Sequence, residues 1–407
     1  MIKRKRIYFD YAATTPVAPA VLAQMQKYFA VEFGNPSSLH RLGQAALKAV
    51  DFSREKIKLL IEANSVQEII FTSSATESNN LIIKGVALDY YFRYRRPSHL
   101  VSSQIDHPSV TEILKDLEKL TLAEVTLIAP EKSGLISPTV VLASIKPNTA
   151  LISIHYVNSE IGVIQPIAEI ASKLKEINAR RAAVSDLPKV IFHTDAAQAP
   201  LTENISIKEL GVEAMTLSAH KIYGPKGIAC LYKKESIALL RLLSGSEQEF
   251  NWRPGTENVP GIVGLAAALE SAVRKRLETK NHLFKIKKYF ARKLEAAKIN
   301  FKLNPSVSNW NYDLATSFQS TSPKIVNLYL PEAEAQDLLV YLDQKGIAVS
   351  PGLACKARAL IPSPVIEALY PHSDRSSRSL RFSFGRETLE AEIDYLVAEL
   401  KKFLAKK

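Results

Sequence analysis

Ser218-Ala219-His220-Lys221-Ile222-Tyr223-Gly224-Pro225-Lys226-Gly227 is a polar stretch that separates two apolar runs. The run before it covers residues 214–217 and the run after it covers residues 228–232, and both are typical of short buried strands. Lys221 is therefore predicted to lie on a turn between two strands, where lost solvation lowers the pKa of an amine and lets it form a Schiff base. A solvated surface lysine is the ordinary alternative, and this stretch alone favours it.

The composition is that of a large soluble protein with a substantial core. The chain has 407 residues, 46% of them hydrophobic, which suggests two or three domains. The formal net charge of +12 suits a soluble enzyme, with an acidic partner or nucleic acid as the alternative. The cysteines, Cys230 and Cys355, have neither metal-ligand spacing nor a disulfide framework. We therefore expect no metal and a reducing cytoplasm.

Nothing in the sequence predicts export or a membrane span. The basic residues 1–6 run directly into residues 7–10, without the apolar core of a signal peptide. No apolar run approaches the roughly 20 residues that a membrane span needs. We expect a protein that is neither exported nor membrane-bound.

Strands and helices alternate as far as about residue 260. Apolar strands are predicted at 68–72, 99–103, 124–129, 149–154 and 190–194, with helices at 18–29 and 41–63 before them and at about 74–87, 109–120 and 167–179 between them. This order predicts a largely parallel sheet covered on both faces. The helix at 41–63 is expected to bury a face containing Ala45, Ala49, Phe52, Ile57 and Leu60.

A second, smaller α+β domain is predicted from the remainder. The chain is helical from 261 to 299 and mixes strands and helices from 325 to 400, so residues 1–15 and 261–407 are assigned to the small domain and 16–260 to the large one. The second half of the helical region is strongly basic, and we expect a solvated face, with an acidic-partner or RNA surface as the alternative. Its basic residues are Lys285, Lys287, Lys288, Arg292, Lys293 and Lys298.

Polar residues recur just after the predicted strands. In open α/β sheets ligands bind beyond the carboxyl ends of the strands, so the recurrence predicts a site there. Ser74 and Glu77 fit a capping box, and the helix start that they mark is a ready anion site. The strand-end residues are Thr76, His107, Asn158, Asp195, Gln198, Ser218 and Lys221.

Taken together, these segments resemble the cysteine desulfurases of the nitrogen-fixation and iron–sulfur-cluster type, within the class V aminotransferases. The resemblance implies the fold-type-I pyridoxal-phosphate scaffold, a mostly parallel seven-stranded-type sheet with helices on both faces plus a smaller α+β domain. The matching segments occur in the family's order and span most of the chain. They are DYAATTP at 10–16, FGNPSS at 33–38, ATESN at 75–79, NSEIG at 158–162, HTDAAQ at 193–198, SAHKIYGPKG at 218–227, RPGTEN at 253–258 and LRFSFGR at 380–386.

The resemblance implies a role for each residue near the cofactor ring. Lys221 would carry pyridoxal 5'-phosphate and later move the Cα proton of the substrate. Asp195 would pair with the pyridinium nitrogen and keep the ring an electron sink. Gln198 would donate to the phenolic oxygen. His107 would stack on the ring and act as acid and base, although a turn residue is the ordinary alternative for a single His-Pro pair.

The resemblance also implies an anion site and a carboxylate site. The backbone N–H groups of Ala75 and Thr76, with Ser218 and His220, would hold the phosphate. Thr256 would reach the phosphate of a neighbouring subunit, which implies a homodimer with composite sites. The substrate carboxylate would be bound by Asn158 and Arg381, with Arg381 as a bidentate fork, and Asn35 is assigned to substrate binding. Arg386 is assigned a structural role.

Cys355 would decide the reaction class. Its surroundings at 349–358 contain Pro, Gly and small residues, which suits a mobile loop, and Lys356 and Arg358 favour the thiolate. Pro351 and Leu353 depart from the family's Ser/Gly/Ala-rich run. The implied reaction converts L-cysteine to L-alanine, and a persulfide on Cys355 carries the sulfur to an acceptor or scaffold protein. Cys230, in a predicted strand, is expected to be a small core residue.

Two other functions remain open from the sequence. One is another class V enzyme, such as a selenocysteine lyase or a small-amino-acid aminotransferase. The other is a binding module without catalysis that uses the basic helix near residues 285–293. The presence of Lys221, Asp195, His107 and Cys355 together argues against the binding module.

Overall fold

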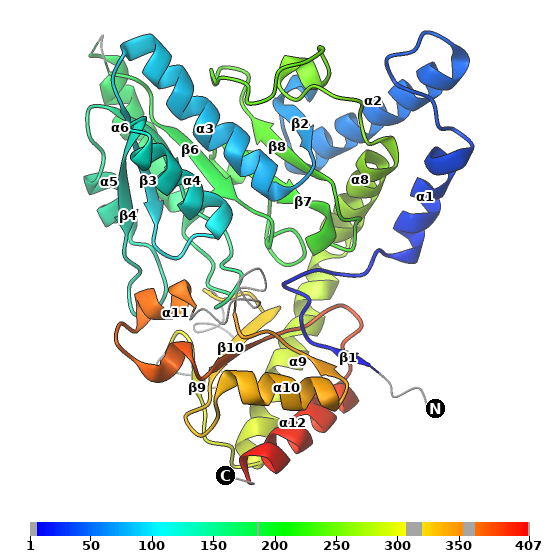
Figure 1. The fold of residues 1–407 in the computed structure, drawn as a ribbon, viewed down its shortest axis with the longest axis vertical. Helices are drawn as coiled ribbons and strands as arrows, with labels where there is room; N and C mark the ends of the chain where they lie inside the picture. The colour runs from blue at the N-terminus through cyan, green and yellow to red at the C-terminus, as the bar shows by residue number, and fades with distance from the viewer. Residues whose placement is uncertain (1–5, 185–186, 307–319, 353–362, 406–407) are drawn as a thin grey trace.

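The computed structural model describes residues 6–184, 187–306, 320–352 and 363–405. Figure 1 shows a large sheet with its helices in the upper part of the molecule and smaller sheets with helices α9, α10 and α12 in the lower part. The alternation of strands and helices predicted from the sequence is confirmed.

The large sheet has seven strands in the order β2-β8-β7-β6-β5-β3-β4. All neighbouring pairs are parallel except the two that involve β8, which runs against β7 and β2. The mostly parallel sheet of the predicted fold class is therefore confirmed. Its strands are β2 (Ile69–Thr72), β3 (Ser98–Ser103), β4 (Ala123–Ile128), β5 (Thr149–Ser153), β6 (Ile191–Asp195), β7 (Ala214–Ser218) and β8 (Ala229–Lys233).

Helices cover both faces of this sheet, as predicted. Alternate residues of β2 point to opposite faces: Ile69 and Phe71 join one buried cluster and Ile70 joins the other. One face carries α3 (Ala75–Tyr94) and α4 (Pro108–Lys119). The cluster on the other face includes α1 (Pro19–Ala30), α2 (Arg41–Ile61), α5 (Pro138–Ala143), α6 (Ile167–Ala182), α7 (Ile207–Leu210) and α8 (Val259–Arg274). The short α5 and α7 were not predicted.

The lower part of the molecule has its own buried cluster. A three-stranded sheet, in the order β12-β10-β9, and a parallel pair of β1 (Ile7–Tyr8) with β11 (Ile347–Ala348) contribute to it. The N-terminal strand therefore pairs with a strand that lies 340 residues later. The elements of this part are β9 (Lys302–Leu303), β10 (Ile325–Tyr329), β12 (Ser379–Ser383), α9 (Arg276–Ala296), α10 (Ala335–Gln344) and α12 (Glu390–Leu404). Helix α11 (Pro364–Leu369) packs instead against the cluster of the large sheet that includes α1 and α2.

The buried face of α2 differs from the prediction. Phe52 is 66% exposed, while Ala49, Ser53 and Ile57 are buried. Helix α2 packs closely along α8, so small side chains line the contact and a phenyl ring is turned outward. The prediction that Phe52 belongs to the core is wrong.

The basic face predicted for α9 is also partly wrong. Lys287 is buried, and its Nζ donates to Thr321 Oγ1 and to the Ser322 carbonyl at 3.2 Å each. Burial lowers the pKa of Lys287 to about 7. This lysine joins α9 to the segment before β10 and is not part of a solvated surface.

Within the described ranges, the helices are too short or too polar to cross a membrane. The same residues contain no cluster of three or more His, Cys, Asp or Glu side chains that could hold a metal ion. Cys230 is a buried residue of β8, as predicted, and burial raises the pKa of its thiol to about 12.

Candidate active site

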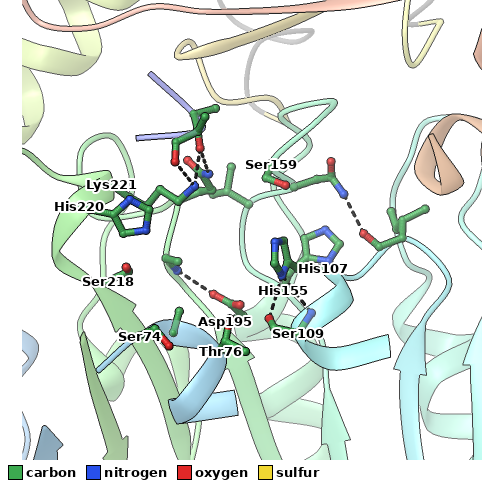
Figure 2. A pocket seen from close by; sticks show the side chains of 18 of the residues that line it. Ser74, Thr76, His107, Ser109, His155, Ser159, Asp195, Ser218, His220 and Lys221 are labelled. Atoms are coloured by element: carbon green, nitrogen blue, oxygen red, sulfur yellow. Dashed lines mark hydrogen bonds between the residues drawn. The ribbon is translucent and has the colours of Figure 1, made fainter. Parts of the chain in front are cut away.

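A cavity of about 240 Å³ lies at the carboxyl edge of the large sheet. Its lining comes from the segments after β1, β3, β5, β6 and β7, from the start of α3, and from Arg381 of β12. Figure 2 shows these side chains converging from separate elements. Eight of the strand-end and helix-start residues singled out from the sequence line this cavity: Thr76, His107, Asn158, Asp195, Gln198, Ser218, His220 and Lys221.

Lys221 ends a 3-10 turn, η2 (Ala219–Lys221), that follows β7 directly. Its Nζ donates to the carbonyl oxygens of Ala12 at 2.6 Å and Ala13 at 2.8 Å, and these bonds are the dashed lines beside Lys221 in Figure 2. The turn is fixed by Thr15, whose hydroxyl donates to the His220 carbonyl and accepts from the Tyr223 N–H. The amine is therefore held inside the cavity between the sheet edge and the N-terminal segment.

Asp195 is the last residue of β6 and is only 8% exposed. Its Oδ2 accepts a hydrogen bond from Asn79 Nδ2 at 2.8 Å, and its Oδ1 accepts one from the Ala197 N–H at 3.0 Å. Asn79 belongs to α3 and also donates to Ser109 Oγ at 2.9 Å. Asn79 was not predicted as a partner of Asp195, because an Asn inside a helix gives no signal of its contact with a strand end.

His107 caps the N-terminus of α4. Its Nδ1 accepts from the Ser109 N–H at 3.1 Å and lies 2.8 Å from Ser109 Oγ. A neutral ring that accepts at Nδ1 carries its proton on Nε2. Burial lowers the pKa of His107, and Lys221 lowers it further, although Asp195 opposes them. The ring is therefore neutral near pH 7, as an acid–base group requires.

His155 lines the same cavity and was not among the predicted residues. Its Nδ1 lies 3.0 Å from Asp106 Oδ1. Burial alone would raise the pKa of Asp106, but His155 and Ser103 outweigh burial, so the pKa is lowered. His155 follows β5 and lies just before the NSEIG motif at 158–162, so neither that motif nor HTDAAQ at 193–198 includes it.

The start of α3 forms the base of the cavity. Ser74 is its N-cap and accepts from the Glu77 N–H at 3.2 Å, as predicted. The return bond of the predicted capping box goes one residue earlier, because Glu77 Oε2 accepts from the N–H of Ser73. Ala75 and Thr76 follow the cap and line the cavity, so helix N–H groups face it.

Arg381 reaches the cavity from β12, in the lower part of the molecule. It is 2% exposed, and its guanidinium donates to Asp10 Oδ1 at 2.6 Å and to the Ser159 carbonyl at 3.0 Å. Asn158 holds its own loop, since its amide donates to the Ile105 carbonyl and accepts from the N–H groups of residues 160 and 161. Arg381 therefore joins the two parts of the chain at the cavity wall.

Gln198 bridges the cavity wall and a buried lysine. Its Nε2 donates to the Ala12 carbonyl at 2.8 Å, and its Oε1 accepts from Lys324 Nζ at 3.1 Å. Lys324 is 1% exposed and was missed, because a lysine before a strand is ordinarily solvated.

Two predicted site residues, Asn35 and Thr256, do not line this cavity. Asn35 is exposed and its Oδ1 accepts from the Ser37 N–H, in the loop between α1 and α2. Thr256 is also exposed and does not line the cavity, although the bond from Arg253 Nε to Glu77 Oε1, 2.9 Å, holds its loop beside the start of α3. Cys355 lies outside the described residues.

The residues that line the cavity fit a phosphorylated, polar ligand. Ser218 Oγ, His155 Nε2 and Arg381 Nε are buried atoms that have no hydrogen-bond partner within the described residues. Burial and then Lys221 lower the pKa of His220 to about 4, so its ring is neutral, and its Nδ1 lies 3.1 Å from Thr14 Oγ1. Orphaned polar atoms in a cavity with an anion-binding helix start indicate that a ligand completes them.

Comparison with known sequences gives one family. The model of the aminotransferase class-V family matches residues 7–396. The cysteine desulfurase IscS of Dictyoglomus turgidum is 35% identical over 99% of this chain and 95% of its own length. The putative cysteine desulfurase IscS 1 of Bacillus subtilis is 38% identical over 94% of each chain.

Solved structures agree with the sequence comparison. A NifS-like protein superposes with a TM-score of 0.87 at 28% identity, covering 99% of this chain and 100% of its own. A structure described as SspA in complex with cysteine superposes with a TM-score of 0.76 at 32% identity, covering 95% of this chain and 100% of its own. The fold predicted from the sequence is thus that of solved relatives.

Proposed function

The chain belongs to the class-V aminotransferase family, and from that membership and the geometry of its cavity we propose that it works as a cysteine desulfurase. It is a pyridoxal-phosphate enzyme that takes the sulfur from L-cysteine and releases L-alanine. The observation that carries this function is the convergence of Lys221 and Asp195, from the ends of neighbouring strands, on one cavity with orphaned polar atoms. The complex of the relative SspA with cysteine favours cysteine as the substrate.

Pyridoxal phosphate, when bound, supplies an electron sink for the charge that develops on the substrate. Lys221 would hold it covalently, and Asp195 would pair with the ring nitrogen, fixed in place by Asn79 and Ala197. Gln198 would donate to the phenolic oxygen. The phosphate would lie on the N–H groups of Ala75 and Thr76 with Ser218 and His220, where Ser218 Oγ has no partner among the described residues.

Two groups are assigned to proton movement. Lys221, once free of the cofactor, would take the Cα proton of the substrate. His107 would act through Nε2, because Nδ1 already accepts from the Ser109 N–H. The lowered pKa keeps the ring neutral with its proton on Nε2, so His107 would first donate that proton and would take one back from a thiol afterwards.

Arg381 is assigned to the substrate carboxylate. Its Nε is buried and without a partner in the described part of the chain, so a carboxylate there satisfies it, while Asp10 and the Ser159 carbonyl hold the rest of the guanidinium. Asn158 would contribute from the same wall. Asn35, which does not line the cavity of its own chain, also belongs to the proposed substrate site and would be supplied by a second copy.

Cys355 is proposed to receive the sulfur. Its sulfur forms a bond to the substrate sulfur while the substrate carbon–sulfur bond breaks, so cysteine and one thiol give alanine and one persulfide without any oxidant. The persulfide then passes to an acceptor or scaffold protein for iron–sulfur cluster or other thio-cofactor synthesis. The same proposal includes a homodimer, in which Thr256 completes the site of the neighbouring subunit, and a cytoplasmic location. It also includes two domains, a large one at residues 16–260 and a small one at residues 1–15 and 261–407.

The test is incubation of the purified yellow protein with cysteine and a reductant, scoring alanine, sulfide and the mass of Cys355. Equal amounts of alanine and sulfide, with a transient mass increase of one sulfur at Cys355, are expected. Cys355→Ala should keep the cofactor absorbance and lose alanine release, while Cys230→Ala, a change in the core, serves as the control. Alanine release by Cys355→Ala at the parent rate would contradict the persulfide role.

A further inference from the structure

Lys324 is a buried lysine that lies directly before β10 and has no part in the proposed function. Its Nζ donates to Gln198 Oε1 at 3.1 Å and to the carbonyl oxygen of Lys221 at 3.4 Å. Its backbone is fixed on both sides, because its N–H donates to Ser322 Oγ and its carbonyl accepts from the Phe384 N–H. Lys324 therefore contacts two residues assigned to the cofactor, from an element in the other part of the molecule.

The bonds of Gln198 give its amide a definite direction. A side-chain amide has a donor end and an acceptor end of nearly equal shape, so only its partners decide which end faces which way. Lys324 offers N–H donors to Oε1, while the Ala12 carbonyl accepts from Nε2 at 2.8 Å. The same carbonyl accepts from Lys221 Nζ at 2.6 Å, so the four residues form one connected network.

The charges around Lys324 favour its neutral form but do not remove its N–H donors. Burial lowers its pKa well below the ordinary value, and Lys221, Arg381 and Arg386 lower it further, while Asp10 opposes them. An amine keeps N–H donors whether or not it carries the extra proton. Its bond to Gln198 is therefore available in both states.

We propose that Lys324 is a positioning residue for the cofactor, which fixes the amide of Gln198 so that the Nε2 end faces the cavity and donates to the phenolic oxygen of pyridoxal phosphate. This inference rests on the proposed function. It adds a residue outside the cavity lining whose effect on the cofactor passes entirely through Gln198.

The experiment uses the loaded full-length protein and records the absorbance of the bound cofactor as a function of pH. The absorbance changes when the nitrogen that joins the cofactor to Lys221 loses its proton. A donor to the phenolic oxygen favours loss of that proton. In Lys324→Gln, the amide at 324 can donate or accept, so Gln198 is free to turn. The midpoint of the absorbance change is expected to rise by roughly half a unit to one unit, the effect of one ordinary hydrogen bond.

Two further variants separate positioning from other effects. Lys324→Arg keeps the donors and should give a smaller shift. Lys287→Met removes the other buried lysine that contacts the segment before β10, through Thr321 and Ser322, and should leave the midpoint unchanged. A shift in Lys287→Met equal to that in Lys324→Gln would assign the effect to any change in the contacts of the segment before β10 and overturn the inference.

A double-mutant cycle decides whether Lys324 acts through Gln198. In a Gln198→Ala background, Lys324→Gln should add no further shift, since there is no amide left to orient. A full further shift would mean that the charge of Lys324 acts directly on the cofactor, and an unshifted Lys324→Gln would also overturn the inference. If the parent protein took up no pyridoxal phosphate, the proposed function itself would fail; parent binding with unshifted variants refutes only the role of Lys324.

Discussion

Asp195 is held by donors from two different elements. Asn79 of α3 and the N–H of Ala197 each occupy one carboxylate oxygen, which leaves the carboxylate oriented and buried at the end of β6. A strand-end Asp with this support can present a fixed negative charge to a ring nitrogen. The support matters as much as the residue, because an unsupported carboxylate at a sheet edge turns toward water.

Asp195→Asn should lower the rate of alanine formation from cysteine by roughly 10- to 100-fold, the effect of one charged hydrogen bond or somewhat more. The neutral amide cannot keep the ring nitrogen protonated, so the electron sink weakens, while the cofactor still binds. The measurement is kcat for alanine release together with the cofactor content. Asn79→Ala keeps the carboxylate and loses one of its donors, so a smaller loss is expected. An Asp195→Asn enzyme as fast as the parent would contradict this role.

Single residues were predictable where they followed a strand within a motif. Lys221 and Asp195 belong to this group, His107 follows a predicted strand outside these motifs, and all three lie at the cavity. Asn79, His155 and Lys324 were not predicted, because their importance comes from contacts with residues far away in sequence. Lys324, for example, contacts Gln198 across 126 residues. Local pattern carries no information about such a contact.

At the scale of the element, the start of α3 combines a structural cap with a ligand site. Ser74 accepts from the Glu77 N–H, and the N–H groups that follow face the cavity. Ser65 caps the short turn η1 (Val66–Glu68) in a similar way, accepting from the Gln67 N–H, but does not line the cavity. Comparing Ser74 with Ser65 therefore separates the effect of a cap on helix stability from its effect on ligand binding.

Ser74→Ala and Ser65→Ala should each lower the free energy of unfolding by about 1 kcal/mol, as expected for a lost cap. Only Ser74→Ala should also weaken cofactor binding, by roughly 5- to 30-fold, because it disturbs the helix start that holds the phosphate. Urea unfolding and titration with pyridoxal phosphate measure the two effects. Equal cofactor affinities in the two variants would show that the start of α3 is only structural.

Helix α9 shows that a basic residue in a charged helix need not face solvent. Its basic residues suggested a solvated face, yet Lys287 points into the protein and bonds to the segment before β10. The sequence could not show this, because the neighbouring segment that covers Lys287 lies 34 residues later. Phe52 of α2 shows the reverse case, because this aromatic residue was expected in the core but is exposed where α2 packs closely on α8.

Lys287→Met should stabilise the protein by about 1–3 kcal/mol near neutral pH, since a buried charge is replaced by an apolar chain of similar length. The pKa of Lys287 is about 7 in the folded protein and 10.5 ordinarily, so between these values the unfolded chain binds more protons. The stability of the parent therefore rises with pH across this window, and the advantage of the variant should shrink. Thermal unfolding at several pH values measures it, with the exposed Lys285→Met as control. A variant that is less stable than the parent throughout the window would contradict the prediction.

At the scale of the whole molecule, the cavity exists because two parts of the chain meet. Arg381 of β12 bonds to the Ser159 carbonyl of the upper part, Lys324 bonds to Gln198, and the segment after β1 receives the amine of Lys221. The sequence predicted the edge of the large sheet at which ligands bind, since alternating strands and helices determine that edge. How the lower sheets close the cavity depends on contacts such as these, which no periodicity reveals.

The large sheet also contains two histidines that join its strands. His99 lies between Thr149 of β5 and Thr126 of β4, at 2.7 and 2.9 Å. His193 lies between Ser153 of β5 and Thr216 of β7, at 2.9 and 3.1 Å. Both side chains are fully buried, and neither lines the cavity. Changes in their protonation should therefore affect the stability of the sheet and not the binding of a ligand.

These two histidines should make the protein lose stability in mild acid. Burial lowers the pKa of each from 6.5 to about 4, so between those values the unfolded chain binds protons that the folded sheet excludes. The free energy of unfolding should therefore be fully retained above pH 6.5 and should fall as the pH drops toward 4. Urea unfolding of the loaded enzyme at a series of pH values measures the slope. His99→Gln and His193→Gln should each flatten it by close to one proton, whereas His372→Asn, at an exposed position with a left-handed backbone that suits Asn, should leave it unchanged. If both sheet variants kept the slope of the parent, the acid sensitivity would have to come from the carboxylates, and the histidines would already be charged in the folded sheet.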